Sequence, residues 1–234
     1  MLELFPDGFE EEDRPGVLEL AAYTDAAGAT RLWRAFGEYS WSEVPEDWQN
    51  RWREFHRAVR VGPLWVGPPW IEAPDGALAV VIDPGRAFGT GAHPTTQLCL
   101  GFLVDLAAPE RTLLDIGCGS GVLGIAGLLL GFRGAVSLDH DPVTLEAAAE
   151  NARANGVAPD LRLLEALEDP LPEADVAVAN ISATAIETVA GRVRAGRLVT
   201  SGYLATERPD VQAYRFVERR EFDGWAADLW SRPE

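Results

Sequence analysis

The sequence predicts an α/β protein with a doubly wound, mostly parallel sheet of seven strands and a small N-terminal accessory region. From residue 78 onward, apolar runs of strand length alternate with segments of helical periodicity. This alternation is typical of a parallel sheet that helices cover on both faces. A glycine-rich turn, residues 117–121, joins one such strand to the next helix. Turns of this kind let the backbone pass close to a ligand.

The elements of this main part follow from their apolar patterns. We expect strands at Leu78–Ile82, Thr112–Ile116, Gly134–Leu138, Leu161–Leu164, Val176–Ala179 and Arg197–Ser201. We expect helices at Pro94–Leu106, Val122–Leu130, Val143–Ala154 and Ala183–Val193. The tail predicts two more strands, residues 213–222 and 225–230, which turn at Asp223-Gly224. Because Asp-Gly favours tight hairpins, an antiparallel strand is expected at one side of the sheet.

The chain before residue 78 is expected to be accessory. Up to about residue 45 it consists of short extended pieces, such as residues 17–23. Trp48, Trp52 and Phe55 follow at i, i+4 and i+7, which predicts one face of a helix. Residues 59–70, rich in Pro, Gly and Trp, predict a strand pair or a stiff connector. We therefore divide the chain into an N-terminal region (1–45), a linker (46–77) and a main domain (78–234).

Composition excludes several classes of protein. The formal net charge is −17, and all twenty basic residues are arginine, so direct binding to nucleic acid is disfavoured and a cationic partner is favoured. The two cysteines, Cys99 and Cys118, form no spaced cluster, which argues against a metal site and a disulfide framework. The longest apolar run, Leu123–Phe132, is shorter than the roughly 20 residues of a membrane span. Because the N-terminal residues lack the pattern of a signal peptide, we expect a cytoplasmic location.

The glycine turn predicts a nucleoside site at the carboxyl ends of the strands. Gly117, Cys118 and Gly119 form the turn, and the helix start behind it offers free N–H groups. Asp139 ends the next strand, 22 residues after Gly117, where a carboxylate accepts the ribose hydroxyls. Asp115, ahead of the turn, is placed to bind an amino group. Ala166-Leu167 are placed to contact an adenine through their backbone. This combination predicts S-adenosylmethionine (SAM) as the cofactor.

A dinucleotide is the competing interpretation. Residues 119–124 are a literal GxGxxG, the fingerprint of NAD-binding folds. Three features oppose it. Asp115 would repel a pyrophosphate. The glycines at 117, 119 and 121 shift the turn upstream of the dehydrogenase version. A closing hairpin is also foreign to classical dinucleotide folds.

Two further segments give the chain a family resemblance. Residues 82–96, with Phe88-Gly89-Thr90-Gly91-Ala92-His93-Pro94-Thr95-Thr96, precede the turn, and Asn180-Ile181-Ser182-Ala183 follow the fourth strand. Together with Leu114–Gly121 and Leu138–Pro142, they resemble the PrmA family. These bacterial enzymes, built on a Rossmann-like SAM-dependent methyltransferase fold, methylate amino groups of ribosomal large-subunit protein eleven.

The resemblance implies specific site residues. Thr96, Gly117, Asp139 and Asn180 occupy the family's SAM-contacting positions, and the loop that includes Phe88, Gly89 and Thr90 is implied to fold over the methionine end. Two departures stand out. Fewer residues than in the family precede the linker, so the N-terminal recognition region looks truncated. Ser182 also replaces a leucine in the motif around Asn180.

The expected chemistry is transfer of a methyl group to a neutral amine, for which orientation and a dry site matter most. We expect the amide oxygen of Asn180 to accept a hydrogen bond from the amine, without a dedicated general base. His93 is expected only to shape its loop, and Asp141 to cap the helix that begins near Pro142. The alternatives are a related methyltransferase for another protein or a small amine, and a non-catalytic SAM-binding module.

Overall fold

The computed structural model describes residues 10–14, 17–21, 26–37, 56–84, 89–166 and 168–233. The chain forms two compact units, residues 1–50 and 51–234. The helix that the sequence predicts around Trp48 and Trp52 lies outside the described residues. Within the described part of the chain, none of the helices is both long enough and apolar enough to cross a membrane.

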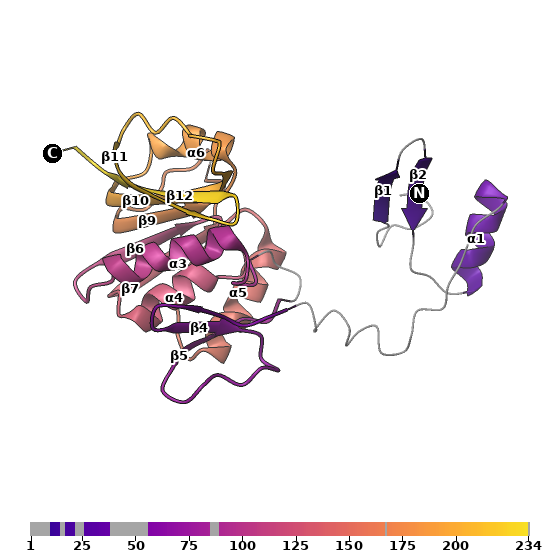
Figure 1. Cartoon of the computed structure of the whole chain (residues 1–234), viewed down its shortest axis with the longest axis horizontal. Helices are drawn as coiled ribbons and strands as arrows, with labels where there is room; N and C mark the ends of the chain where they lie inside the picture. The colour runs from indigo at the N-terminus through magenta and orange to yellow at the C-terminus, as the bar shows by residue number, and fades with distance from the viewer. Residues whose placement is uncertain are drawn as a thin grey trace. The chain divides into compact units, whose positions relative to one another are not determined.

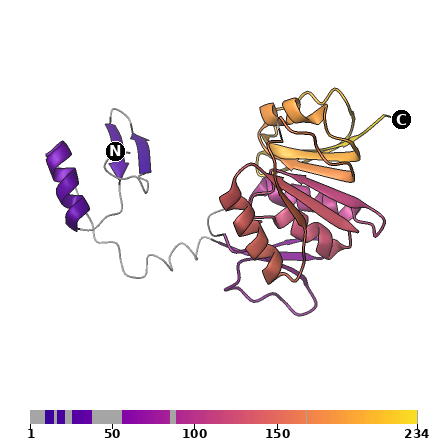
Figure 2. The same cartoon turned by 180° about the vertical axis from the view of Figure 1, so that it is seen from behind.

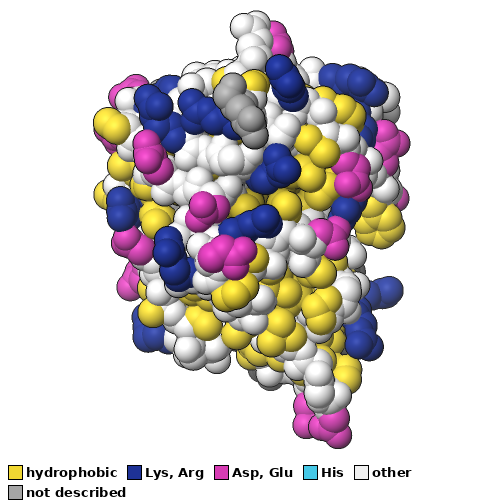
Figure 3. Space-filling model, turned by 90° about the vertical axis from the view of Figure 1, so that its left-hand side faces the viewer, with side chains coloured by type: hydrophobic (Ala, Val, Ile, Leu, Met, Phe, Trp, Pro, Cys, Tyr) yellow, Lys and Arg dark blue, Asp and Glu magenta, His cyan; other side chains and the backbone are white. Residues whose placement is uncertain are grey.

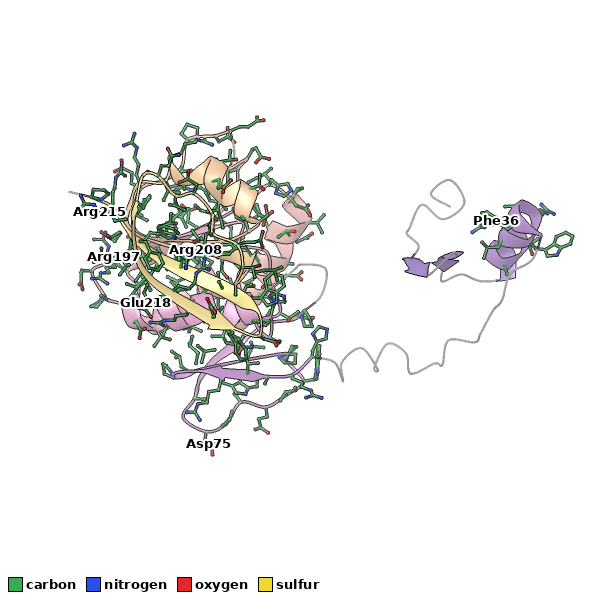
Figure 4. The ribbon with its side chains drawn as sticks, turned by 45° about the horizontal axis from the view of Figure 1, so that its top comes forward. Phe36, Asp75, Arg197, Arg208, Arg215 and Glu218 are labelled. Carbon is green, nitrogen blue, oxygen red and sulfur yellow. The ribbon has the colours of Figure 1, made fainter. Side chains whose placement is uncertain are left out.

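The N-terminal unit contains a hairpin and a helix. Strands β1 (Glu10–Arg14) and β2 (Val17–Ala21) pair antiparallel, with Glu10 opposite Ala21. Helix α1 (Ala26–Phe36) ends at Gly37, whose φ of 80° suits a left-handed helix end. The expectation of extended pieces alone was therefore wrong, because it overlooked the helical spacing of Leu32, Trp33 and Phe36. Phe36, labelled in Figure 4, and Trp33 are exposed on α1.

A small sheet of three strands opens the second unit. Strands β3 (Val59–Val61) and β4 (Leu64–Gly67) form an antiparallel pair around Gly62, so the predicted strand pair is confirmed. Strand β5 (Leu78–Val81) pairs parallel to β4. We expected this segment in the main sheet, which was wrong. Its apolar run indicates burial without saying which strand it pairs with, and here it pairs with β4.

The main sheet confirms the predicted fold class. In the described part of the chain, seven strands lie in the order β11-β12-β10-β9-β6-β7-β8 (Figures 1 and 2). Strands β6 to β10 are mutually parallel, and β12 pairs antiparallel with β10 and β11. Their bounds are β6 Thr112–Ile116, β7 Gly134–Asp139, β8 Asp160–Leu163, β9 Ala174–Asn180, β10 Ala195–Leu204, β11 Arg215–Phe222 and β12 Trp225–Ser231.

The closing hairpin forms as the sequence predicts. Asp223 and Gly224 both have positive φ, 49° and 77°, as the tight turn between β11 and β12 requires. Ser231 of β12 faces Arg197 of β10 on one side and Arg215 of β11 on the other. Figure 4 labels these two exposed arginines.

Helices cover both faces of the main sheet. Helices α3 (Pro94–Leu106), α4 (Val122–Leu130) and α5 (Pro142–Ala154) supply residues to one apolar cluster, together with the small sheet. Helix α6 (Ala183–Ala190) supplies the opposite cluster. Strand β6 shows the alternation, since Leu113 joins the first cluster and Leu114 the second. Helix α6 is shorter than predicted because it ends at Gly191.

A shallow hollow lies where β6, β9 and β10 begin, at the opposite ends of the strands from the glycine turn. Its lining includes Arg133, Arg194 and Arg232 together with Glu173 and Asp175. Figure 3 shows arginine side chains mixed with carboxylates on the face of the molecule that it views. The lining of this hollow therefore carries charges of both signs.

Candidate active site

The glycine turn between β6 and α4 is tied to the end of β7. Gly117, Gly119 and Gly121 have φ values of 73°, 54° and 81°, which side chains rarely tolerate. A Cβ on Gly117 would lie 2.6 Å from Ile181 Cγ2. The backbone N–H groups of Gly117 and Cys118 both donate to the Leu138 carbonyl at 2.9 Å. The turn therefore has a fixed shape at the carboxyl edge of the sheet, where doubly wound folds bind nucleosides.

Asp139 lies beside this turn at the end of β7. Its Oδ2 accepts the Gly119 N–H at 3.1 Å, and its Oδ1 accepts the Asp141 N–H at 3.1 Å. The side chain is 9% exposed. Two backbone donors thus hold the carboxylate in one orientation, and His140 Nδ1 lies 3.5 Å from its Oδ1. A carboxylate at this place in a doubly wound fold can accept the hydroxyls of a ribose.

Asp115 lies fully buried beneath the turn. Its Oδ2 accepts the Gly124 N–H at 3.1 Å, while Oδ1 has no hydrogen-bond partner among the described residues. Burial raises the pKa of Asp115 to about 7, and the charge of Asp139 adds to this effect, against the lowering by the Gly124 hydrogen bond. A buried carboxyl oxygen without a partner is costly. The amino group of SAM, reached directly or through water, is a partner of the right charge, so the residues present fit this cofactor.

Thr96 and Asn180 meet across the same edge. Thr96, in the first turn of α3, is fully buried, and Asn180 is the last residue of β9. The Asn180 Nδ2 donates to Thr96 Oγ1 at 3.4 Å. Because the amide nitrogen has this partner, the amide oxygen is left to act as an acceptor. The structure thus joins two predicted site residues that lie 84 positions apart.

His93 is the N-cap of α3. Its Nδ1 accepts the Thr95 N–H at 3.4 Å and lies 2.7 Å from Thr95 Oγ1. The imidazole also packs edge-on against Trp225, with ring centroids 4.9 Å apart. These contacts agree with the expected shaping role. Asp141 caps α5, since its Oδ1 accepts the Val143 N–H at 2.9 Å, as predicted.

Gly202 positions the segment after Asn180, and sequence reasoning missed it. Its φ is 104°, and a Cβ there would collide with the Ile181 carbonyl. In return, the Ile181 N–H donates to the Ser201 carbonyl at 3.0 Å. A glycine just after a predicted strand was the available signal. Ser182, the residue after Ile181, is the N-cap of α6, and its hydroxyl oxygen accepts the Ala185 N–H.

Of the remaining predicted residues, the structure describes Gly89, Thr90, Cys118 and Ala166. Gly89 lies beside the turn, because Ser120 Oγ donates to the Gly89 carbonyl, and Thr90 follows it. Ala166 follows β8, where its carbonyl accepts a hydrogen bond from Arg192 Nη1 at 2.9 Å. Cys118 is buried, and burial raises the pKa of its thiol. Phe88 and Leu167 lie outside the described residues.

In the described part of the chain, no cluster of His, Cys, Asp and Glu suits a metal ion.

A doubly wound sheet closed by an antiparallel hairpin, with a carboxylate beside its glycine turn and a second one beneath it, defines a SAM-dependent methyltransferase. The model of the family described as ribosomal protein L11 methyltransferase (PrmA) matches residues 13–227. The chain therefore belongs to the PrmA family. Both the resemblance and the preference for SAM over a dinucleotide are confirmed.

Individual relatives agree. The ribosomal protein L11 methyltransferase of Actinobacillus pleuropneumoniae serotype 3 is 41% identical over 221 residues, which cover 87% of this chain and 75% of that protein. Its counterpart in Symbiobacterium thermophilum is 43% identical over 209 residues, covering 83% and 68%. The solved structure of a ribosomal protein L11 methylase from Lactobacillus delbrueckii subsp. bulgaricus has a TM-score of 0.68 and 26% identity, covering 76% of this chain and 99% of that one.

Proposed function

We propose that this protein transfers methyl groups from SAM to amino groups of ribosomal protein L11. The observation that carries the chemistry is the contact between Asn180 and Thr96 at the edge of the sheet that holds the glycine turn. It supports the proposal that the amide oxygen of Asn180 lies next to the methionine end of the cofactor. The choice of substrate is supported by the names of the relatives, which are ribosomal protein L11 methyltransferases.

The cofactor contacts that we propose follow from the positions of these residues at the carboxyl edge of the sheet. Asp139 accepts hydrogen bonds from the ribose hydroxyls, and Asp115 binds the amino group. Thr96 lies at the methionine end. Backbone atoms contact the nucleoside along the turn and the flanking loops. The full proposed set is Phe88, Gly89, Thr90, Thr96, Asp115, Gly117, Cys118, Gly119, Asp139, Ala166, Leu167 and Asn180. When bound, SAM supplies a methyl group that its sulfonium already activates.

The protein's own part is to present a neutral amine. Asn180 Oδ1 accepts one N–H of the amine, so that the nitrogen lone pair faces the methyl group. A lysine amine loses its proton on entry because a site of low dielectric lowers its pKa. The proton leaves to solvent. We assign His93 no role as a base and propose that it shapes its loop as the N-cap of α3.

Charge and location fit such a substrate. The formal net charge of −17 favours a cationic partner such as a lysine-rich ribosomal protein. We place the reaction in the cytoplasm, where ribosomal proteins are made. We also propose residues 1–45 as an N-terminal recognition region, residues 46–77 as a linker and residues 78–234 as the SAM-dependent methyltransferase domain.

The experiment combines purified protein, ribosomal protein L11 and isotopically labelled SAM, with mass spectrometry to locate the label. Methylated amines on L11 are the expected result, and the Asn180→Ala variant should give almost none. Label on a different protein or on a small amine would replace the substrate. SAM binding without transfer to any acceptor, including whole-cell protein from a strain lacking this gene, would indicate a binding module instead.

A further inference from the structure

Ser120 and Asn151 form a hydrogen-bond chain that the proposed chemistry does not use. Asn151, on α5, is 4% exposed. Its Nδ2 donates to the Ser120 carbonyl at 3.0 Å, and its Oδ1 accepts the Asp83 N–H at 2.9 Å. Ser120 is fully buried, and its Oγ donates to the Gly89 carbonyl. One residue of the glycine turn thereby holds both Asp83, through Asn151, and Gly89.

These contacts depend on specific chemistry. The amide of Asn151 uses a donor and an acceptor at once, which neither aspartate nor leucine offers. Gly89 approaches Ser120 so closely that an added Cβ would lie 3.2 Å from Ser120 Oγ, and its φ is 102°. Asp83 and Gly89 are therefore each held in position relative to the glycine turn, by hydrogen bonds from the buried Asn151 and Ser120.

Asn155 provides an internal comparison. It is the C-cap residue of α5, one turn after Asn151. Its Oδ1 accepts the Val81 N–H at 2.8 Å, and its Nδ2 donates to the Val81 carbonyl at 2.6 Å. Among the described residues, it makes no hydrogen bond to the glycine turn. Both asparagines hold the chain near the end of β5, but only Asn151 connects it to the cofactor site.

We propose that Ser120 and Asn151 are positioning residues for SAM binding. They hold Gly89, and with it Thr90, beside the glycine turn before the ligand arrives. Ordering a binding segment during folding removes that cost from the binding step and raises affinity. Neither residue needs to touch SAM for this effect. The inference rests on the proposed function, because it concerns the same cofactor crevice.

The test measures SAM affinity by calorimetry, without protein substrate, alongside melting temperature and turnover. Ser120→Ala and Asn151→Leu should weaken SAM binding about tenfold, the loss expected for one buried hydrogen bond. Turnover at saturating SAM should stay within about twofold of wild type, because the reacting groups are unchanged. Asn155→Leu is the matched control. It should lower the melting temperature about as much as Asn151→Leu and leave SAM affinity unaltered.

The outcomes separate this inference from the proposed function. If Ser120→Ala binds SAM as tightly as wild type, or if Asn155→Leu weakens binding as much as Asn151→Leu does, the positioning role is wrong. Should Asn151→Leu fail to fold, Ser120→Ala decides alone, since it removes only the bond to Gly89. A wild-type protein that binds no SAM would instead overturn the proposed function itself.

Discussion

The amide of Asn180 donates to the hydroxyl of Thr96, and this 3.4 Å contact joins the end of β9 to the first turn of α3. It orients the amide, because the nitrogen is engaged and the oxygen is left as the acceptor. His93 fixes the same turn of α3 as its N-cap. Two independent elements therefore converge on the position that we assign to the incoming amine.

Replacing Asn180 with alanine tests this assignment directly. The variant loses the acceptor that aims the amine, so turnover should fall by about 100-fold, as for other lost hydrogen bonds to a reacting group. SAM affinity should fall much less than turnover, because the other proposed cofactor contacts remain. Turnover and SAM binding are measured separately, by mass spectrometry and calorimetry. Ser182→Ala is the control, since Ser182 caps α6, and near-normal activity in Asn180→Ala would remove the proposed role.

Asp139→Ala should weaken SAM binding. The carboxylate is held by the Gly119 and Asp141 N–H groups, and we propose that it accepts the ribose hydroxyls. Loss of a hydrogen bond to a charged group costs about 1.5–3 kcal/mol, or roughly 10- to 150-fold in the dissociation constant. Calorimetry with SAM gives this value. Asp160→Ala on the exposed strand β8 should bind as wild type does. Equal affinity in both variants would contradict ribose recognition by Asp139.

Asp115 should make the stability of the ligand-free protein depend on pH. Its folded pKa is raised to about 7, above that of an unfolded aspartate near 4. The folded state therefore binds the extra proton between these values, and the free energy of unfolding should fall as pH rises through this window. The slope is at most about 1.4 kcal/mol per pH unit.

Urea unfolding between pH 5 and pH 8 measures this dependence. Asp115→Asn should flatten the curve, because it removes the titrating group. Asp175 is a carboxyl group from which we expect no such pH dependence. Its pKa is lowered by hydrogen bonds from Thr112, so it is ionised in both states above pH 5 and contributes no slope there. SAM affinity should rise over the same range, since its ammonium favours the ionised carboxylate. Stability that is independent of pH in wild type would mean that Asp115 is ionised throughout.

The sequence predicts the main sheet because its signals are local. A continuous apolar strand such as Thr112–Ile116, followed by a glycine turn and a helix, specifies both the element and its place. The contact between Asn180 and Thr96 was not predicted from spacing. Both residues were assigned by family resemblance, and the resemblance carries no distance.

Long-range pairing explains what the sequence did not predict. The apolar run of β5 gives no sign that it pairs with β4 outside the main sheet. Asn151 and Asn155 look like ordinary helix residues, because their partners, Asp83 and Val81, lie about 70 positions away. Buried polar side chains of this kind become visible only when packing brings the partners together.

Gly202→Ala should be among the most damaging small substitutions in the protein. The φ of 104° already disfavours any side chain, and the new Cβ would meet the Ile181 carbonyl. Relief requires β10 and the segment after Asn180 to separate, which breaks the hydrogen bond from the Ile181 N–H to Ser201. We expect a loss of about 2–4 kcal/mol in the free energy of unfolding, with turnover reduced more than SAM affinity because Asn180 is displaced.

Gly196→Ala on the same strand is the control, since the nearest atom to its added Cβ, the Asp175 carbonyl oxygen, would lie at an ordinary 3.5 Å. Urea unfolding and kinetic assays of both variants decide the matter, and equal behaviour of the two would show that Gly202 does not hold the catalytic segment.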